Sequence, residues 1–239
     1  MPLISDAATR TARAASKRAA VLRYLASEVW STADLIGRAA GIGCRRVSNR
    51  LLSTLAREGS VRRAPAPDLS ALTIWGITPH GRAVVAGMDA GIDPAGPVFE
   101  PGRVALSAIP HRLMIQRLRA AGEAAGWTGW TPGDRLARDL ATRPDAIGTR
   151  PDGVRLAIEA ERTVKTPQRY RAIVAGHLKA ITAGSYAGVY VVAPPSLVSG
   201  LARIFAAVRL PGGGALTAAE RKRFRVVAET DFPPKKKDE

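Results

Sequence analysis

A short apolar run that follows a tight turn constrains the fold of this chain more than any other feature. Residues 154–161 read Val-Arg-Leu-Ala-Ile-Glu-Ala-Glu, and they come directly after Pro151-Asp152-Gly153. This turn signal between two runs, residues 143–150 and 154–161, predicts a β-hairpin. Because residues two apart in a strand point to the same face, Glu159 and Glu161 are expected to project together from one edge of a sheet.

The register of this hairpin decides whether a third acid joins the two glutamates. A three-residue loop that ends on Gly153 pairs Arg150 with Val154 and places Asp145 opposite Glu159. Directly opposed Cβ atoms are roughly 4.5–5.5 Å apart, so the acids would then crowd one patch. A two-residue Asp-Gly loop instead pairs Ala146 with Glu159 and turns Asp145 to the other face.

Acids crowded in this way repel one another unless a cation or protons neutralise them. Their oxygen-only ligand set suits Mg²⁺ or Mn²⁺, which take one or two carboxylates together with waters and substrate phosphates. Asp145 and Glu159 are the candidate metal ligands. A cationic group follows them in the sequence and consists of Arg162, Lys165, Arg169 and Arg171. Acids beside cations fit a phosphodiester substrate.

The composition also favours a nucleic acid as the partner. The chain has 239 residues, 36 Lys and Arg against 20 Asp and Glu, a formal net charge of +16 and a pI of about 11.2. Such an excess attracts polyanions, because each neutralised phosphate releases condensed counterions. The apolar fraction of 46% is sufficient for one large core or two ordinary ones.

Several function classes are disfavoured by what the sequence lacks. It has no run of about 18 apolar residues for a membrane span, and its polar start lacks the apolar core of a signal peptide. The single cysteine, Cys44, cannot form an internal disulfide. We therefore expect a protein of the reducing cytoplasm that does not associate with membranes.

The first 86 residues have the pattern of a DNA-binding module. Apolar spacing predicts a helix over residues 11–28, a short helix capped by Ser31 or Thr32, a glycine turn at residues 41–43, and a third helix over residues 44–58. The residues of this third helix that are expected to face inward are Val47, Leu51 and Leu55. Those expected to face outward are Arg45, Arg46, Asn49 and Arg50. Arginine can pair with guanine and asparagine with adenine, and both also suit phosphates.

The segment after the third helix resembles the wing of a winged helix-turn-helix domain. Residues 60–63, which include Arg62 and Arg63, and residues 72–78 read as strands around a proline-rich tip at residues 64–68. Thr78-Pro79 then begins a closing helix. A three-helix protein-interaction domain with a solvated basic face is the alternative.

We expect a domain boundary in the glycine- and proline-rich residues 87–109. This divides the chain into a DNA-binding domain (1–86), a linker (87–109), a second domain (110–230) and a basic tail (231–239). The second domain is expected to be α/β with one mixed sheet flanked by helices. Its predicted helices are residues 110–126, 134–140, 167–182 and 196–208, and its predicted strands beyond the hairpin are residues 127–130, 186–193 and 223–227.

Arg143-Pro144-Asp145, the hairpin and Ile158-Glu159-Ala160-Glu161 resemble the PD-(D/E)xK nuclease core of restriction endonucleases. In that pattern two acids bind the metal, and a lysine two residues further on acts on the water. Glu161 occupies the lysine position here, so the resemblance implies that Glu161 orients the water and that Lys165 is the displaced lysine. With the amino-terminal module, residues 12–195 are similar to the replication-relaxation family and to MobC-type plasmid relaxases.

This resemblance implies a bacterial, cytoplasmic protein that uses Mg²⁺ or Mn²⁺ to nick duplex DNA at a plasmid transfer or replication origin. Asp145, Glu159, Glu161 and Lys165 would be catalytic, and other relaxosome proteins and a second copy of the chain would be potential partners. Two alternatives remain open from the sequence. One is a DNA-binding accessory protein or regulator with an inactive core, and the other is a restriction or repair nuclease that cuts both strands.

Overall fold

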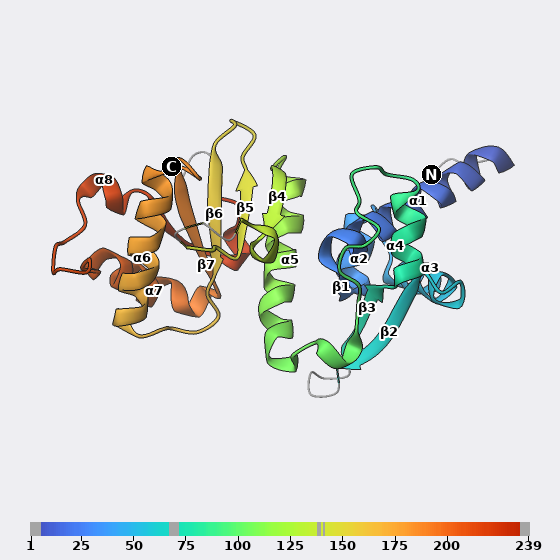
Figure 1. Cartoon of the computed structure of the whole chain (residues 1–239), viewed down its shortest axis with the longest axis horizontal. Coiled ribbons are helices and arrows are strands. Elements are labelled where there is room, and N and C mark those ends of the chain that lie inside the picture. Colours follow the sequence, from blue (N-terminus) through green and yellow to red (C-terminus); the bar gives the residue numbers. More distant parts are fainter. Residues whose placement is uncertain (1–5, 67–71, 138–139, 141, 235–239) are drawn as a thin grey trace. The chain divides into compact units, whose positions relative to one another are not determined.

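The computed structural model describes residues 6–66, 72–137, 140 and 142–234 (Figure 1). Its contacts divide the chain into two compact units, Met1–Gln116 and Arg117–Glu239. Each unit contains helices and one β-sheet, so the chain is a mixed α and β protein. The division falls within helix α5 (Ile109–Ala124).

In the first unit, helices pack against a three-stranded antiparallel sheet of strand order β1-β3-β2. The helices and strands are α1 (Ala7–Glu28), β1 (Trp30–Thr32), α2 (Ala33–Ala39), α3 (Arg45–Arg57), β2 (Val61–Ala66), β3 (Leu72–Ile77) and α4 (Pro79–Ala86). The predicted helices and strands of this region are all present. The expected cap of the second helix is Thr32, whose hydroxyl accepts a hydrogen bond from the Leu35 amide. Residues 64–66 of the predicted wing tip belong instead to β2, and residues 67 and 68 lie outside the described part.

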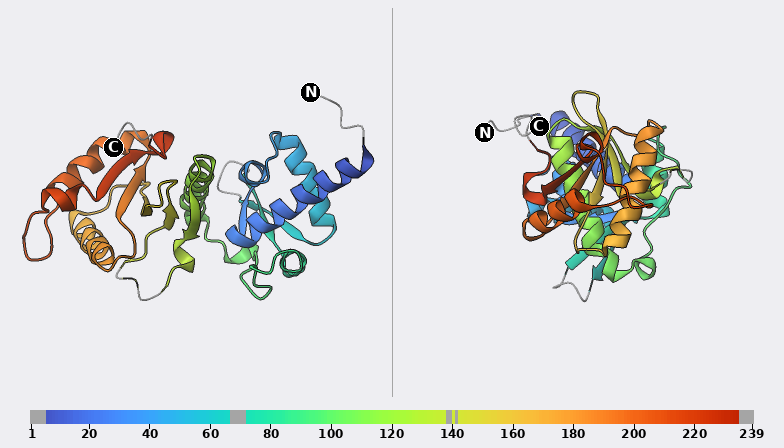
Figure 2. Two further views of the ribbon diagram at one scale, coloured as in Figure 1. Left: turned by 90° about the horizontal axis from the view of Figure 1, so that it is seen from above. Right: turned by 90° about the vertical axis from the view of Figure 1, so that its left-hand side faces the viewer.

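Helix α1 begins at a capping aspartate and extends beyond the core of its unit. The Asp6 carboxylate accepts hydrogen bonds from the amides of Ala8 and Thr9. The helix is exposed through Ser16, and Figure 2 shows this end of α1 projecting from the helices that pack around its other end. Only the later turns, from Val21 onward, contribute to the core.

The buried face of α3 differs from the predicted one only at its first residue, since Leu51 and Leu55 pack on the core as predicted. The structure buries Ser48, Leu52 and Leu55, whereas Val47 is 47% exposed. The reason lies in α2, where Gly37 has no side chain and so lets Ser48 approach closely. A Cβ at position 37 would lie 2.2 Å from the Ser48 hydroxyl oxygen. This close approach turns the helix so that a serine, rather than Val47, faces α2.

The glycine- and proline-rich segment after α4 contains two 3-10 turns, η1 (Pro101–Arg103) and η2 (Leu106–Ala108), and it packs on the first unit. The Phe99 ring lies over Gly76 of β3, and its amide donates to the Ile77 carbonyl oxygen at 2.8 Å. In α5, Gln116 donates to the Trp30 carbonyl oxygen at 2.8 Å. This part of the chain is therefore fixed to β1 and β3.

The second unit is built on a five-stranded mixed sheet of order β4-β5-β6-β7-β8. Strands β4 to β6 are antiparallel, and β6, β7 and β8 are parallel. Besides the end of α5, its parts are β4 (Thr128–Pro132), η3 (Gly133–Arg135), β5 (Ala146–Thr149), β6 (Arg155–Ala160), α6 (Pro167–Thr182), β7 (Gly188–Ala193), α7 (Pro195–Ala207), α8 (Ala218–Arg221), β8 (Phe224–Ala228) and η4 (Glu229–Asp231). The predicted mixed sheet is confirmed.

Helices α6 and α7 share one buried cluster with the sheet. Tyr170 and Val174 of α6 and Phe205 of α7 pack with Ala157 and Val191 of the central strands. Because alternate residues of a strand face opposite sides, Glu159 lies on the same side of β6 as Ala157. The acids of β6 therefore face α6.

The predicted helix over residues 134–140 is wrong for the residues that the structure describes. Only the 3-10 turn η3 forms, and Leu136 is extended with ψ near 151°. The Gly133 amide donates to the Asp145 carbonyl oxygen at 2.8 Å, which fixes this segment against the chain that enters β5. Residues 138, 139 and 141 lie outside the described part.

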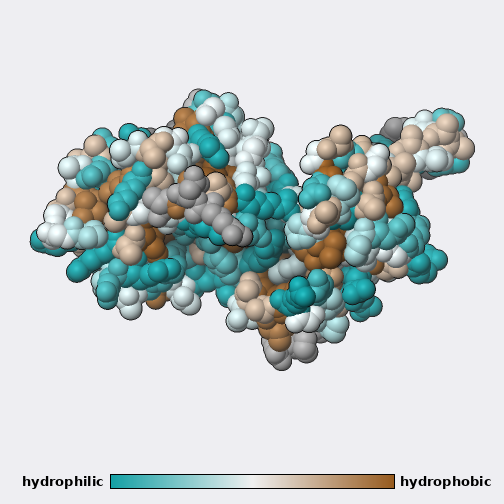
Figure 3. Space-filling view, in the orientation of Figure 1, coloured by the Kyte–Doolittle hydropathy of each residue, from teal (hydrophilic) through white to brown (hydrophobic). Residues whose placement is uncertain are grey.

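The surface drawn in Figure 3 shows apolar residues as separate patches among hydrophilic ones. Within the described residues, no helix is both long enough and apolar enough to cross a membrane.

Candidate functional site

The β5–β6 hairpin has the three-residue loop. The Arg150 amide donates to the Val154 carbonyl oxygen at 2.9 Å, and Ala146 pairs with Ile158. Gly153 has φ +83°, a conformation that glycine adopts without strain. Continuing this register by one pair places Asp145 opposite Glu159, so the alternative that paired Ala146 with Glu159 is wrong.

Asp145 lies at the entrance to β5 and is fixed to the end of β6. Its Oδ2 accepts a hydrogen bond from the Ala160 amide at 2.7 Å. Its carbonyl oxygen accepts from the Gly133 amide. Backbone contacts on both sides therefore set the position of this carboxylate.

We expect Gly133→Ala to destabilise the second unit by about 1–3 kcal/mol, the usual effect of overpacking. The new Cβ would lie 2.2 Å from the Pro144 carbonyl oxygen, and a backbone atom cannot rotate away. Urea unfolding measures the change. The control is Gly200→Ala in α7, where a Cβ meets nothing within 4 Å and alanine favours the helix. Equal unfolding midpoints for the two variants would contradict this prediction.

Glu159 joins a buried chain of hydrogen bonds that reaches from β6 through α6. Its Oε1 lies 2.9 Å from Nε2 of His177, and Nδ1 of that imidazole lies 2.7 Å from the Tyr186 hydroxyl. The His177 side chain is fully buried, and that of Glu159 is 13% exposed. In the neutral imidazole, Nε2 therefore donates to the carboxylate and Nδ1 accepts from the hydroxyl.

The surroundings of Glu159 raise its pKa above the ordinary value. Burial is the main cause, because it disfavours the charged form. The hydrogen bond from His177 opposes the shift, and the negative charges of Asp145 and Glu161 add to it. Asp145 and Glu161 thus both lie close enough to Glu159 to act on its charge.

In metal-free buffer, Glu159→Gln should stabilise the fold at neutral pH. Because the folded pKa is raised, the carboxyl contributes stability below its ordinary value of 4.5, and this contribution is lost as the pH rises through the folded pKa. The amide can still accept the His177 hydrogen bond without a charge. The difference in melting temperature between variant and parent should grow from acidic to neutral pH. For a chain of this size, a change of about 1 kcal/mol in the free energy of unfolding shifts the melting temperature by roughly 2–4 °C.

Asp152→Asn serves as the control for this pH dependence. Asp152 is exposed at the turn of the same hairpin, and the hydrogen bond from Arg150 lowers its pKa. Its contribution is therefore present above the ordinary value and is lost as the pH falls, so the trend should be the opposite. If the melting-temperature difference between Glu159→Gln and the parent does not change with pH, the buried Glu159 carboxylate does not destabilise the fold as predicted.

Glu161 and Lys165 form an ion pair beside the other two acids. Lys165 Nζ contacts Glu161 Oε1, and the side chains are 36% and 3% exposed, respectively. The backbone amide of Lys165 donates to the Tyr170 hydroxyl at 3.2 Å. Tyr170 is fully buried and packs edge-on against Phe205, so its position is that of a core residue.

These acids provide an oxygen-only donor set that suits a hard divalent cation. Within the described residues, no group of three His, Cys, Asp or Glu side chains is placed to hold a metal ion. Asp145 and Glu159 stay the predicted ligand pair. Such an ion would complete its coordination with water and phosphate oxygens, as Mg²⁺ commonly does.

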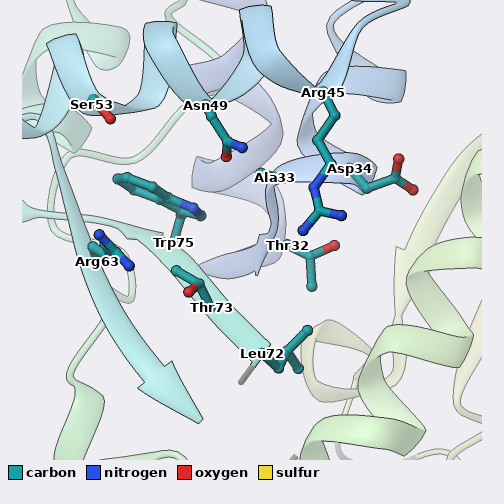
Figure 4. Close-up of a pocket in the computed structure, with 10 residues that line it drawn as sticks. All are labelled: Thr32, Ala33, Asp34, Arg45, Asn49, Ser53, Arg63, Leu72, Thr73 and Trp75. Carbon is teal, nitrogen blue, oxygen red and sulfur yellow. The ribbon is translucent and has the colours of Figure 1, made fainter. Parts of the chain in front are cut away.

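In the first unit, α3, the β2–β3 hairpin and residues 32–34 line an open hollow of about 580 Å³ (Figure 4). Arg45 and Asn49 extend from α3 toward the sheet, and Arg63 lies beside the Trp75 ring, with its guanidinium carbon 5.9 Å from the ring centroid. Arg63 and Trp75 are paired across β2 and β3, so they share one face of the sheet.

The predicted DNA-contacting residues fall into three groups. Arg45, Asn49 and Arg63 line the hollow, whereas Arg46 and Arg50 are exposed elsewhere on α3. Arg62 is paired with Gly76 and faces the other side of the sheet, because neighbouring strand residues alternate. The structure therefore brings three of the six together in the hollow and leaves Arg46, Arg50 and Arg62 outside it.

His177 is a residue of the acidic site that the sequence pattern did not indicate. Its place in α6 could have been anticipated from helical spacing. Tyr170, Val174 and His177 follow the i, i+4, i+7 pattern of a face that packs on the sheet, and all three are buried.

No curated protein and no solved structure matches the chain. A family model described as Replication-relaxation matches residues 22–189. The matched range includes α2, α3, the β2–β3 hairpin, the acids Asp145, Glu159 and Glu161, and His177. Since the match covers more than half of the 239 residues, this chain belongs to the replication-relaxation family.

Proposed function

We propose that this chain binds duplex DNA through its first unit and nicks one strand with its second unit, at a transfer or replication origin of a plasmid or related mobile element. The family description supports a role in replication or mobile-element processes. The net charge of +16 supports a polyanionic partner. Other proteins of the transfer complex would be its partners in the cytoplasm.

The proposed DNA-binding part is a winged helix in which α3 enters the major groove and the β2–β3 hairpin is the wing. Helix α3 carries Arg45, Arg46, Asn49 and Arg50 on exposed positions, and the hairpin follows it directly. In helix-turn-helix proteins the second helix of the pair reads base edges, while neighbouring parts contact the backbone. Arginine and asparagine are residues that can do both.

The observation that carries the nicking proposal is the hairpin register. It places Asp145 opposite Glu159, on the side of the sheet that faces α6, with Glu161 and Lys165 beside them. This arrangement supports a core of the PD-(D/E)xK kind. When Mg²⁺ or Mn²⁺ is bound, it would polarise the scissile phosphate and lower the pKa of a water molecule.

The residues of the chain would divide the remaining work. Asp145 and Glu159 would hold the ion. The hydrogen bond from His177 would orient the Glu159 carboxylate toward it. Glu161 would accept a hydrogen bond from the attacking water. The Lys165 ammonium is partly exposed, so it can reach a phosphate oxygen and offset the negative charge that develops during cleavage.

Incubation with supercoiled plasmid that carries the cognate origin tests this function directly. The full-length chain should convert supercoiled DNA to open circles with Mg²⁺ or Mn²⁺ and leave it unchanged with EDTA. Linear product would indicate cleavage of both strands, as in a restriction or repair nuclease. Duplex binding without any metal-dependent product would reject the nicking proposal and leave the DNA-binding one.

A non-catalytic accessory protein or regulator is the second candidate, and one contact favours it. The Lys165 ammonium is paired with Glu161, the residue at the position where the nuclease pattern has lysine. A core without turnover should show no stabilisation by Mn²⁺. A core that binds the ion should gain about 1.4 kcal/mol in its free energy of unfolding for each tenfold increase in Mn²⁺ concentration above the Kd, and its melting temperature should rise accordingly. Asp145→Asn should remove this stabilisation.

A further inference from the structure

The hollow of the first unit combines two cationic walls with a tryptophan floor. Arg45, Asn49 and Ser53 are spaced four residues apart on α3, so they form one stripe along the wall of the hollow. Arg63, Thr73 and Trp75 of β2 and β3 lie opposite this stripe (Figure 4). A ligand in the hollow would therefore meet cations from both the helix and the sheet.

The charge of this hollow is not neutralised within the described chain. Neither Arg45 nor Arg63 forms an ion pair there. The one acidic residue in the lining, Asp34, is paired with Arg38 at 3.2 Å. Two guanidinium groups on opposite walls favour an anion with several acceptor oxygens, because each planar fork can donate two parallel hydrogen bonds.

An unpartnered donor in the floor indicates where such an oxygen would bind. Trp75 is 5% exposed, and its indole Nε1 is a buried atom with no hydrogen-bond partner. The nitrogen edge of the indole faces the hollow on the side of Asn49 in Figure 4. A buried N–H without an acceptor costs free energy, and a ligand that supplies the acceptor recovers it.

We propose that this hollow binds a phosphate group of a nucleic-acid backbone, with Arg45 and Arg63 pairing with it from opposite walls and the Trp75 indole N–H donating to one of its oxygens. The proposal rests on the DNA-binding function proposed above and adds a path for one strand between α3 and the β2–β3 hairpin. The indole nitrogen is covered in the free chain, so an oxygen in the hollow reaches it only when a neighbouring side chain moves aside. Arg63 and Asn49 are exposed, and their side chains can shift to admit it.

The indole N–H signals of the ¹⁵N-labelled full-length chain test this directly. The four tryptophans give four signals, and Trp75→Phe identifies the one from Trp75. Adding a short mixed-sequence duplex should move this signal downfield, as hydrogen bonding to a phosphate does. The same duplex should leave it in place in the Arg45→Gln/Arg63→Gln double variant.

Affinity for the duplex provides the second measurement. Trp75→Phe keeps a ring and removes the donor, and we expect about a tenfold loss, as for a hydrogen bond to a charged group. Trp130→Phe is the matched control. Its Nε1 is also buried without a partner but belongs to the second unit, so the affinity should not change. Since both variants remove an unsatisfied donor, neither should melt lower through loss of a hydrogen bond.

Inorganic phosphate and AMP, added separately, distinguish the sources of the phosphate. A response to the duplex alone assigns the hollow to the DNA backbone. A response to AMP at lower concentration than to the duplex assigns it to a free nucleotide and still supports the phosphate site. If the duplex binds while the Trp75 signal and the Trp75→Phe affinity stay unchanged, the inference is overturned and the DNA-binding function stands. If neither the duplex nor inorganic phosphate binds or moves the Trp75 signal, both the phosphate site and the proposed DNA-binding function are wrong.

Discussion

Asp145→Asn and Glu159→Gln should each lower the rate of Mg²⁺-dependent nicking by about 10²–10³-fold, a typical effect of removing one charged group that acts on the transition state. Both amides keep the shape of the side chain and remove its negative charge. The Asp145 contact with the Ala160 amide and the Glu159 contact with His177 can persist, because an amide oxygen also accepts hydrogen bonds. The loss would therefore report on charge at the proposed ion site.

Affinity for duplex DNA should remain within about twofold in both variants, since neither residue belongs to the first unit. Asp152→Asn is the matched control, because it removes a carboxylate from the same hairpin at the turn, where the acid is paired with Arg150. It should nick like the parent. If all three variants nick equally well, Asp145 and Glu159 are not the site of cleavage, and a contaminating nuclease becomes the explanation for any nicking.

The sequence reduced the hairpin register to two alternatives, because the register depends on local loop chemistry, and the structure has the three-residue loop. Gly153 accommodates a positive φ at the end of a three-residue loop, and the count outward from Arg150 then fixes every later pair up to the acids. One local choice thus determines which residues share a face. The positions of Asp145 and Glu159 are set by it without knowledge of the remaining fold.

The first buried residue of α3 could not be predicted from periodicity, because it depends on a contact between two helices. The apolar spacing of Val47, Leu51 and Leu55 is a valid helical stripe, but Gly37 leaves space that only a small residue at position 48 can fill. A serine in the core has no hydropathy signal. Only the packing of α2 against α3 shows that Ser48, rather than Val47, faces inward.

The contact between Lys165 and Glu161 is a pairing that their four-residue separation allows but does not establish. It depends on the path of the segment between β6 and α6, where no regular structure fixes the side chains. The sequence did place both residues near the acids. It did not show that the lysine pairs with the glutamate that stands in the lysine position of the nuclease pattern, and this pair motivates both proposed functions.

The double variant Arg46→Gln/Arg50→Gln should weaken duplex binding by about a hundredfold near 0.1 M salt, if each arginine contributes a charged hydrogen bond to the DNA. Both side chains are exposed on α3 outside the lining of the hollow, so their loss leaves Arg45 and Arg63 in place. Each lost phosphate contact also releases about 0.9 fewer counterions. The slope of log Kobs against log salt should therefore become shallower by about two.

Arg203→Gln/Arg209→Gln is the control with the same change in net charge. These exposed residues lie in and just after α7 of the second unit. Long-range attraction alone depends on the total charge and would weaken both double variants alike, whereas contacts made by α3 weaken only the first. Equal affinities and equal salt slopes for the two variants would therefore exclude α3 as the surface that contacts DNA, even though the chain as a whole is strongly basic.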